Sequence, residues 1–362
     1  MRRYSLAAAP FEAARQVTLL PEGHPCGRLH GHSFLARVRA ELPAGWATFP
    51  GAEARQLAEQ LADGVAPLNY RLLNDHLQVP TDENLVRWIR RRLAVPGIET
   101  VGVQSTRDQG ADLDDTGQAH SWRRFRFEAA HRLPHVPQGH PCGRMHGHGF
   151  EVILHAHQDR GDQAMGVDVD QLGECWKPLQ QELHYRCLND IPGLENPTSE
   201  RLAYWVWQRL KPVIPPLSWV TVYETVTAGC HYDGEHYRIW KEQRFESALR
   251  LLQAPEDDPR GRLHGHSYRI RLHLSAPLDE VMGWTVDYGD VKTLFKPLYQ
   301  QLDHQRLDEL AGIADADLAS LLGWIRVLLT DCLPQLDRID LYESPQCGAV
   351  LCWGALRPAL PV

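Results

Sequence analysis

Three histidines in the middle of the chain have the spacing of a metal site. His146 and His148 stand two residues apart on a predicted strand, so both imidazole rings project from one face. His131 ends the preceding predicted strand, and on an antiparallel hairpin it can face that pair. Three neutral imidazoles with one open position are typical of catalytic zinc, so we predict that these residues bind Zn²⁺. The alternative is that they are ordinary histidines, as a lone His-x-His usually is.

A cysteine close to these histidines is a candidate catalytic group. Cys142 precedes His146 by four residues. A nearby zinc ion should lower the pKa of its thiol, so we expect a thiolate that acts as a base or a nucleophile. Two alternatives remain open, a fourth structural ligand or a small residue without a chemical role. Cys175, Cys187 and Cys332 have no such surroundings, and we expect them in the core.

The composition narrows the class of protein. The chain has 362 residues, of which 43% are hydrophobic and 23% charged, and this is ordinary for a soluble globular protein. No stretch approaches the roughly 18 apolar residues of a membrane-spanning helix, and residues 1–10 make a poor signal peptide. Eight cysteines without a dense framework favour free thiols, so we expect a cytoplasmic protein without a membrane partner. A net charge of −8 argues against a general nucleic-acid binder.

The chain contains three copies of one unit. The tripeptide His-Gly-His recurs at spacings of 116 and 118 residues, and an upstream Phe-Glu-Ala/Ser-Ala segment keeps the same spacings. The tripeptides lie at residues 30–32, 146–148 and 264–266. Periods this long indicate tandem domains rather than a solenoid of short repeats. We place the domains at residues 1–118, 119–235 and 236–362.

Each unit has the pattern of a small α+β domain. Phe150, Val152 and Leu154 alternate on one face of a predicted strand, and residues 198–210 place apolar side chains on one helical face, with Thr198 a plausible N-cap. The order of elements is strand, strand, helix, helix, strand, strand. We predict an antiparallel four-stranded sheet covered on one face by a helix pair. Three such sheets can close edge to edge, which removes their exposed edges.

Segments of the second unit resemble a known family. Phe127-Glu-Ala-Ala-His131 and Cys142-Gly-Arg-Met-His-Gly-His148 are similar to the bacterial 6-carboxy-5,6,7,8-tetrahydropterin synthases of queuosine biosynthesis, as are residues 188–200 and 223–230. These enzymes belong to the 6-pyruvoyl-tetrahydropterin synthase family. The three residues between the cysteine and the next histidine resemble the carboxy-forming branch, because the pyruvoyl-forming branch typically has a longer gap. The other two units resemble the family more weakly.

The resemblance implies an architecture. Family members ordinarily have one unit per chain and form trimers whose sheets make a barrel, and two trimers stack into a hexamer. This chain is then three tandem tetrahydropterin-synthase-like (T-fold) units that form a pseudo-trimeric β-barrel. Stacking of two such barrels would make a homodimer.

The resemblance also implies roles for particular residues. The family uses three zinc histidines, a proton-accepting cysteine, a glutamate that anchors the pterin ring, and an aspartate–histidine pair from a neighbouring subunit. The matching residues are, in that order, His131, His146 and His148, then Cys142, Glu224, and Asp303 with His304. We further expect Thr198 and Glu200 to line the pterin pocket, although Thr198 is equally explained as a helix cap.

The two outer units depart from the family pattern at the metal. The first unit has Arg15 at the position of the first zinc histidine and Ser105 at the anchor position. The third unit has Leu249 in place of that histidine and Arg260 in place of the cysteine. We therefore expect zinc in the second unit alone.

The aspartate–histidine pair is distributed differently. Asn69-Tyr70 and His184-Tyr185 occupy its position in the first two units, and only the third unit keeps Asp303-His304. An amide and a phenol offer no group that titrates near neutrality. We predict one composite site per chain, in which the second unit supplies the metal, Cys142 and Glu224, and the third supplies the pair. The alternative is that all three sites are relics in a scaffold protein.

The implied reaction converts 7,8-dihydroneopterin triphosphate to 6-carboxy-5,6,7,8-tetrahydropterin, with release of triphosphate and acetaldehyde. Within the same class, the alternative is 6-pyruvoyl-tetrahydropterin synthase or a related pterin side-chain lyase. In a different class, the alternative is a non-catalytic pterin-binding module. The expected partner in each case is a small pterin, not a nucleic acid.

Overall fold

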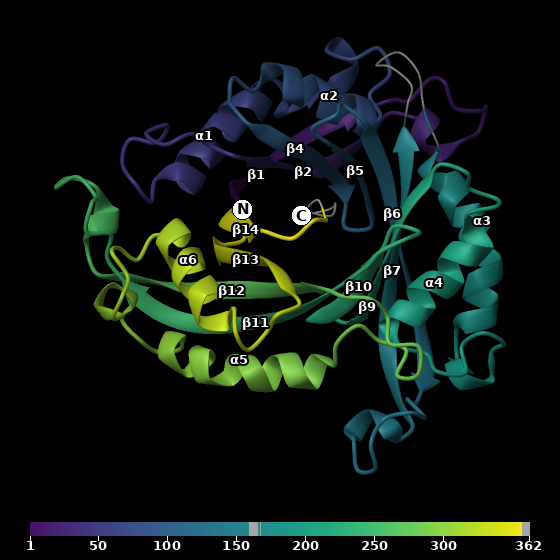
Figure 1. Cartoon of the computed structure of the whole chain (residues 1–362). Coiled ribbons are helices and arrows are strands. Elements are labelled where there is room, and N and C mark those ends of the chain that lie inside the picture. Colours follow the sequence, from purple (N-terminus) through teal and green to yellow (C-terminus); the bar gives the residue numbers. More distant parts are fainter. Residues whose placement is uncertain (159–165, 167, 357–362) are drawn as a thin grey trace.

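The computed structural model describes residues 1–158, 166 and 168–356, and within them one antiparallel sheet closes into a barrel with helices on its outside (Figure 1). The strands are β1 (Arg2–Arg15), β2 (His30–Ala40), β3 (Arg71–Leu72), β4 (Ile98–Thr106), β5 (Gln109–Leu113), β6 (Ala119–His131), β7 (His146–Gln158), β8 (Arg186–Cys187), β9 (Leu217–Thr225), β10 (Ala228–Tyr232), β11 (Tyr237–Leu249), β12 (His264–Ser275), β13 (Leu336–Ser344) and β14 (Cys347–Cys352). The helices are α1 (Glu53–Val65), α2 (Asp82–Arg92), α3 (Val169–Leu183), α4 (Ser199–Leu210), α5 (Tyr288–Leu302) and α6 (Leu318–Leu329). None of the helices in this part of the chain has the length and apolar character needed to cross a membrane.

The order of elements within each unit matches the prediction. In the second unit a long hairpin of β6 and β7 is followed by α3, α4, β9 and β10, and the other two units repeat this order. The sequence did not predict β3 and β8, which are only two residues long and pair in parallel with β1 and β6. The α+β class and the closed barrel are therefore confirmed.

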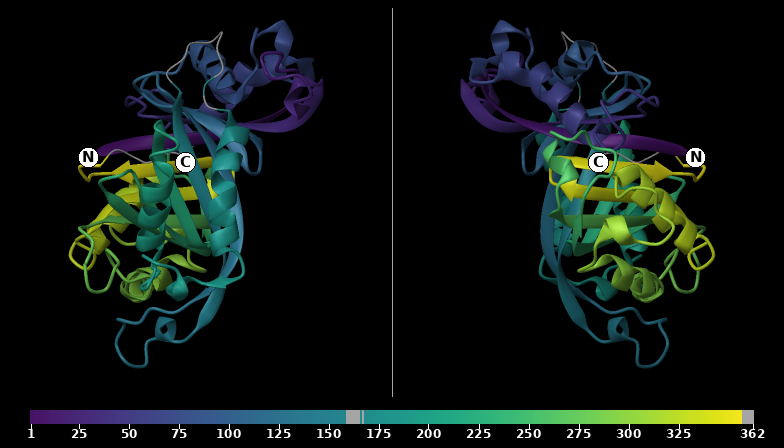
Figure 2. Two further views of the ribbon diagram at one scale, coloured as in Figure 1. Left: turned by 90° about the vertical axis from the view of Figure 1, so that its right-hand side faces the viewer. Right: turned by 90° about the vertical axis from the view of Figure 1, so that its left-hand side faces the viewer.

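The sheet closes through a pairing between the two ends of the chain. Short hairpins join β5 to β6 and β10 to β11, and so connect adjacent units. At the third junction no hairpin joins the two strands. Instead, β14 of the third unit pairs with β1 of the first unit, with a register that runs from Arg2↔Cys352 to Ala7↔Cys347. Figure 2 shows from two sides that the helices remain outside the strands around the barrel. This closure removes the open edges that a single unit would expose.

Each unit has its own hydrophobic core between the sheet and its two helices. An aromatic pair on the long hairpin marks the same place in every core, with ring centroids 4.9–5.0 Å apart. The pairs are Phe11 with Phe34, Phe127 with Phe150, and Phe245 with Tyr268. The apolar face predicted within residues 198–210 is buried in the second core, and Thr198 Oγ1 caps α4 by accepting a hydrogen bond from Arg201 N at 3.2 Å.

The expected burial of three cysteines is wrong. Cys175, Cys187 and Cys332 are half-buried, and Cys175 and Cys332 pack at the margins of the second and third cores. All eight cysteines are free thiols, as the sequence led us to expect.

Gly229, where β10 packs tightly between β9 and β11, provides a test of the packing of the barrel strands. Gly229 of β10 lies beside a register shift, and a Cβ added there would lie 2.1 Å from the Val222 carbonyl oxygen and 2.5 Å from the Trp240 ring. We expect Gly229→Ala to lower the free energy of unfolding by about 2–3 kcal/mol, because the Val222 carbonyl belongs to the strand backbone and cannot move away without disturbing the sheet. Chemical denaturation measures this change.

The matched control is Gly323→Ala in α6. A Cβ at Gly323 would meet no atom within 4 Å, so alanine should leave stability unchanged or raise it by up to about 1 kcal/mol. Equal stability of the Gly229 variant and the wild type would contradict the packing described for β9, β10 and β11.

Candidate active site

The hairpin of the second unit brings the three predicted histidines together. The antiparallel register of β6 and β7 pairs His131 directly with His146, and their ring centroids are 4.5 Å apart. His148 is two residues further along β7, with centroids 5.2 Å from His131 and 5.0 Å from His146. The three rings therefore share one face of the hairpin, as their spacing predicted.

Hydrogen bonds on the far side of two rings leave nitrogen lone pairs free at the centre. His131 Nδ1 donates to the Pro197 carbonyl at 3.0 Å, and His146 Nδ1 donates to the Arg144 carbonyl at 2.8 Å. A ring that donates through Nδ1 presents an unprotonated Nε2, which is the usual arrangement of a metal-binding histidine.

Two of the inward nitrogens are buried without a partner. His131 Nε2 and His148 Nε2 have no hydrogen-bond partner among the described residues. Burial also lowers the pKa of both histidines, which favours the neutral form that binds metal. Buried polar atoms are rarely left unpaired in folded proteins, so these residues fit a metal ion between them.

A carboxylate completes the cluster. Glu224, near the end of β9, has Oε1 3.6 Å from His148 Nε2 and 3.9 Å from His131 Nε2, and its Oε2 accepts a hydrogen bond from Ser199 at 2.6 Å. One ligand atom from each of the three histidines and Glu224 lies within 4.8 Å of the others. Imidazole and carboxylate donors suit several first-row divalent metal ions, including zinc.

Cys142 is held by a short turn that docks on the third unit. It lies in the 3₁₀ turn Pro141–Gly143, where its backbone N–H donates to His140 Nδ1 at 3.2 Å. His140 Nε2 in turn lies 3.0 Å from an oxygen of Asp287, the N-cap of α5. His140 and Asp287 were not predicted from the sequence, although the Gly-His-Pro-Cys-Gly-Arg segment that contains His140 occurs twice, at residues 23–28 and 139–144.

The protein groups around Cys142 favour the neutral thiol. Burial raises the pKa of this thiol, and the negative charges of Glu224 and Asp287 raise it further. A bound cation would act in the opposite direction. The thiolate expected from the sequence would therefore require a bound cation, because the surrounding side chains favour the neutral thiol.

A cleft of about 700 Å³ lies between the second and third units beside this cluster. Cys142 and Glu224 line it from the second unit, and the segment from Met282 to Asp290 lines much of the opposite wall. Such a volume is in the range of small-molecule sites.

Thr198 and Glu200 lie on the wall of this cleft and also join the two units. Thr198 Oγ1 donates to the Gly283 carbonyl, and Glu200 accepts hydrogen bonds from the Thr285 N–H at 2.8 Å and its hydroxyl at 3.1 Å. Glu200 is only 2% exposed, and burial raises the pKa of its carboxyl to about 7. Both residues thus have a structural role at the seam beside any contact with a ligand.

The structure does not bring Asp303 and His304 to Cys142 within one chain. Asp287 and Asp303 are the N-cap and C-cap of α5, and a rise of about 1.5 Å per residue separates them by roughly 24 Å along the helix. Cys142 docks near the first of these ends, through His140, whereas His304 lines a separate pocket with His264 and His266. The predicted contact inside one chain is therefore wrong, because the sequence did not show which end of α5 meets the second unit.

The Asp303–His304 pair is well formed, and its histidine is exposed. His304 Nδ1 lies 3.0 Å from Asp303 Oδ2, and 77% of the His304 side chain is exposed. Asp303 Oδ1 accepts a hydrogen bond from the Glu246 N–H at 3.0 Å, and this bond is the main cause that lowers the pKa of the Asp303 carboxyl. The His304 imidazole is therefore accessible to another molecule, while Asp303 is held against β11 of its own unit.

The site of the first unit is filled by its own side chains. Arg15 pairs with His30 in the register that pairs His131 with His146, and its guanidinium forms an ion pair with Asp82 and lies 3.3 Å from His32 Nε2. The cavity beside Cys26 measures about 50 Å³, against about 700 Å³ in the second unit. A fixed cation thus occupies the place that a metal would take.

The third unit has an apolar side chain at this place. Leu249 pairs with His264 in the same register and is 2% exposed within the core. Arg260 replaces the cysteine, and its guanidinium is bound by Asp258 at 2.7 Å and stacks over Phe49 at 4.6 Å. No group at Leu249 can bind a metal.

Comparison with known proteins agrees with the repeated architecture. One curated relative, the 6-carboxy-5,6,7,8-tetrahydropterin synthase of Synechocystis sp., is 38% identical over 118 residues, which are 31% of this chain and 90% of the relative. A putative 6-carboxy-5,6,7,8-tetrahydropterin synthase of Archaeoglobus fulgidus is 26% identical over 107 residues, covering 28% of this chain and 88% of that protein.

Among solved structures, the Caenorhabditis elegans 6-pyruvoyl tetrahydropterin synthase is 17% identical, covers 31% of this chain and 92% of its own, and superposes with a TM-score of 0.28. The family model of 6-pyruvoyl tetrahydropterin synthase matches residues 7–113, 120–235 and 238–352, which together are most of the sequence. The chain therefore belongs to the 6-pyruvoyl tetrahydropterin synthase family, with three copies of the family's unit in tandem.

Proposed function

We propose that the chain is a zinc-dependent pterin lyase that converts 7,8-dihydroneopterin triphosphate to 6-carboxy-5,6,7,8-tetrahydropterin and releases triphosphate and acetaldehyde. The observation that carries this proposal is the cluster of His131, His146 and His148 with Glu224, a carboxylate that lines an open cleft together with Cys142. The curated relatives support the carboxy-forming branch by their printed names. When bound, zinc would supply Lewis-acid polarisation of the substrate's side-chain hydroxyls.

Other residues of the chain are proposed to bind the pterin ring and to accept a proton. Glu224 is the proposed anchor, because a carboxylate can accept two parallel N–H donors from one edge of a pterin ring. Ser199 already orients this carboxylate through a hydrogen bond of 2.6 Å. Cys142 is the proposed proton acceptor, held towards the cleft by the turn that His140 caps.

The second proton-transferring group requires another copy of the chain. Cys142 lies near the N-terminal end of α5, through the contact of His140 with Asp287, whereas His304 follows the C-terminal end of this helix. We therefore propose that two barrels form a homodimer in which each cleft receives His304 of the partner subunit. The exposure of the His304 side chain supports this arrangement, since an exposed imidazole is available to a partner. Asp303 would orient the imidazole, as an aspartate does in other catalytic pairs.

Metal content gives the first test of this proposal. We expect about one zinc per chain, because only the second unit has three histidine ligands. His146→Ala should reduce the zinc content to nearly zero. The matched control is His264→Ala, which removes the equivalent histidine of the third unit and should leave the content unchanged. Elemental analysis of the purified protein measures both, and three zinc ions per chain would contradict the assignment.

The role of Cys142 can be separated from metal binding. Cys142→Ala should lower kcat by about 10²- to 10⁴-fold, which is the usual contribution of a general acid or base, while the zinc content stays at the wild-type value. Cys26→Ala changes the same Gly-His-Pro-Cys-Gly-Arg segment in the first unit and should leave kcat unaltered. Turnover and product identity are measured by chromatography of the pterins. Full activity of the Cys142 variant would remove this residue from the mechanism.

Mixing two inactive variants tests whether the site is shared between chains. Cys142→Ala and His304→Ala should each be inactive alone. After the subunits are exchanged, a mixed dimer has one cleft with an intact cysteine and an intact His304 of the partner subunit. With random pairing, about a quarter of the wild-type activity should return, because half of the dimers are mixed and each has one complete cleft.

The control for this experiment mixes His304→Ala with the double variant Cys142→Ala/His304→Ala. No His304 is then present, and activity should stay absent. If the first mixture also remains inactive although mixed dimers are detected by mass spectrometry, the shared site is excluded.

A further inference from the structure

A cavity of about 210 Å³ lies inside the barrel, on the side of the sheet away from the helices. Its walls include residues of all three units, which face one another across the interior of the closed sheet. Four arginines line it, namely Arg37 of β2, Arg124 of β6, and Arg269 and Arg271 of β12. Arg37 shows the orientation, because the neighbouring Ala36 and Val38 pack in the core of the first unit and alternate residues of a strand face opposite sides.

Carboxylates neutralise only part of this charge. Arg124 Nη1 donates to Glu151 at 2.5 Å, and Arg271 Nη2 donates to Glu242 at 2.9 Å. The same Glu242 oxygen is 3.8 Å from Arg269, so one carboxylate serves two guanidinium groups. Arg124 also has a buried Nε without a hydrogen-bond partner in the described part of the chain.

Arg37 has a neutral partner in place of a carboxylate. Its Nη2 donates to the amide oxygen of Gln104 at 2.8 Å, and no carboxylate of the described residues lies within ion-pair distance of it. Asp112 acts on it only at longer range, and burial lowers the pKa of Arg37 in spite of that acid. Four guanidinium groups thus face Glu151, Glu242 and Asp112, which leaves at least one positive charge uncompensated.

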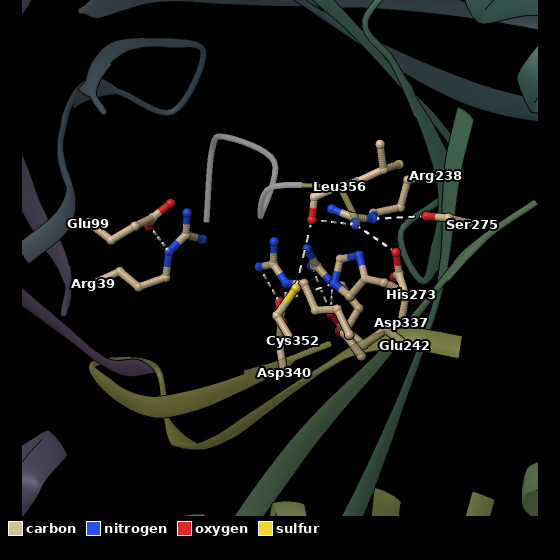
Figure 3. A network of polar contacts seen from close by, with 12 residues as sticks. Arg39, Glu99, Arg238, Glu242, His273, Ser275, Asp337, Asp340, Cys352 and Leu356 are labelled. Atoms are coloured by element: carbon tan, nitrogen blue, oxygen red, sulfur yellow. Dashed lines mark hydrogen bonds and ion pairs between the residues drawn. The ribbon is translucent and has the colours of Figure 1, made fainter. Parts of the chain in front are cut away.

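Three arginines elsewhere in the interior each have a carboxylate of their own, although Nη1 and Nη2 of Arg39 lack a hydrogen-bond partner in the described part of the chain. Arg338 donates to Asp340 at 2.6 and 2.8 Å. Arg238 lies 2.7 Å from Asp337, and Arg39 forms an ion pair with Glu99 (Figure 3). Unneutralised charge is therefore a property of this cavity and not of the whole barrel interior.

The cavity arises from differences between the units. Arg37 and Arg271 each stand five residues after the His-Gly-His tripeptide, where the second unit has Ile153. Arg124 stands three residues before the repeated phenylalanine, where the first unit has Ala8. The small side chain of Ala8 leaves open the space into which the arginines project.

We propose that this cavity binds a phosphoryl oxyanion, either inorganic phosphate or inorganic triphosphate. Arginine binds such anions with paired, charge-assisted hydrogen bonds, and the hydroxyls of Tyr223 and Tyr342 on the wall offer additional donors. The volume is about seven times the roughly 30 Å³ share of a water molecule, which is enough for an oxyanion with some water. The site is distinct from the cleft at Cys142 and does not depend on the lyase activity.

Isothermal titration of the intact protein with inorganic phosphate, and separately with triphosphate, tests the proposal. We expect one site per chain whose affinity falls about tenfold in Arg37→Ile, since one charge-assisted contact is lost. This variant copies Ile153 of the second unit and should keep the wild-type turnover. Arg92→Ile, on α2 outside the barrel, removes the same charge and should bind the anion as the wild type does.

A second variant covers the case in which Arg37→Ile does not fold. Ala8→Glu copies Glu242 of the third unit, fills the cavity and supplies the missing negative charge, so it should abolish binding. A higher affinity for phosphate or for triphosphate identifies which of these two anions is the ligand of the cavity. Absence of binding to the wild type at millimolar anion, or equal affinity of the wild type and the Arg37 and Ala8 variants, would overturn the proposal.

Discussion

The antiparallel register of the long hairpin is the constraint on which the histidine cluster of the second unit depends. In every unit the last residue of the first strand pairs with the first histidine of His-Gly-His. These pairs are Arg15 with His30, His131 with His146, and Leu249 with His264. A shift of one residue would turn the pair to the opposite face, so the backbone alone sets where this side chain points. The chemistry of each unit then follows from the residue at this position. It is a cation in the first unit (Arg15), an imidazole in the second (His131) and an apolar side chain in the third (Leu249).

The seam between the second and third units gives the cleft its second wall. His140 reaches the N-cap of α5 at Asp287, and Glu200 accepts both hydrogen bonds from Thr285. These contacts fix the N-terminal end of α5 beside Cys142. The helix then carries its other end away from the cleft, since its length is set by 15 residues of regular backbone. The position of His304 is thus a consequence of the seam.

Much of the fold was predictable because its signals are local. The alternation after each His-Gly-His, the apolar face within residues 198–210 and the cap at Thr198 each depend on residues close in sequence. The convergence of His131 with His146 and His148 followed in the same way from strand periodicity. The repeat spacing added the one long-range fact that a single unit would not have provided.

The parts that sequence could not supply depend on contacts between distant segments. Nothing in the residues around His304 shows which end of α5 docks on the neighbouring unit. The burial of Cys175 depends on where a helix margin meets the core, and the two-residue strand β8 exists only because β6 passes beside it. The charged cavity in the barrel likewise combines residues from three units that no linear pattern connects.

The turn that contains His304 has the same backbone conformation in all three units, although its side chain differs. Tyr70, Tyr185 and His304 all have φ between 55° and 57°, a region that costs a non-glycine residue about 1 kcal/mol or more. In each case the strained residue donates its N–H to the carbonyl of the glutamate in the Phe-Glu motif, at 2.6–2.7 Å. The strain is therefore held by the same hydrogen bond in all three units, whether or not the side chain can transfer a proton. Each turn directs an exposed side chain outwards, so replacing histidine by tyrosine changes what the turn offers to another molecule without changing the turn. Within one chain the three units can thus keep a common backbone while only the third unit has the aspartate–histidine pair at this turn.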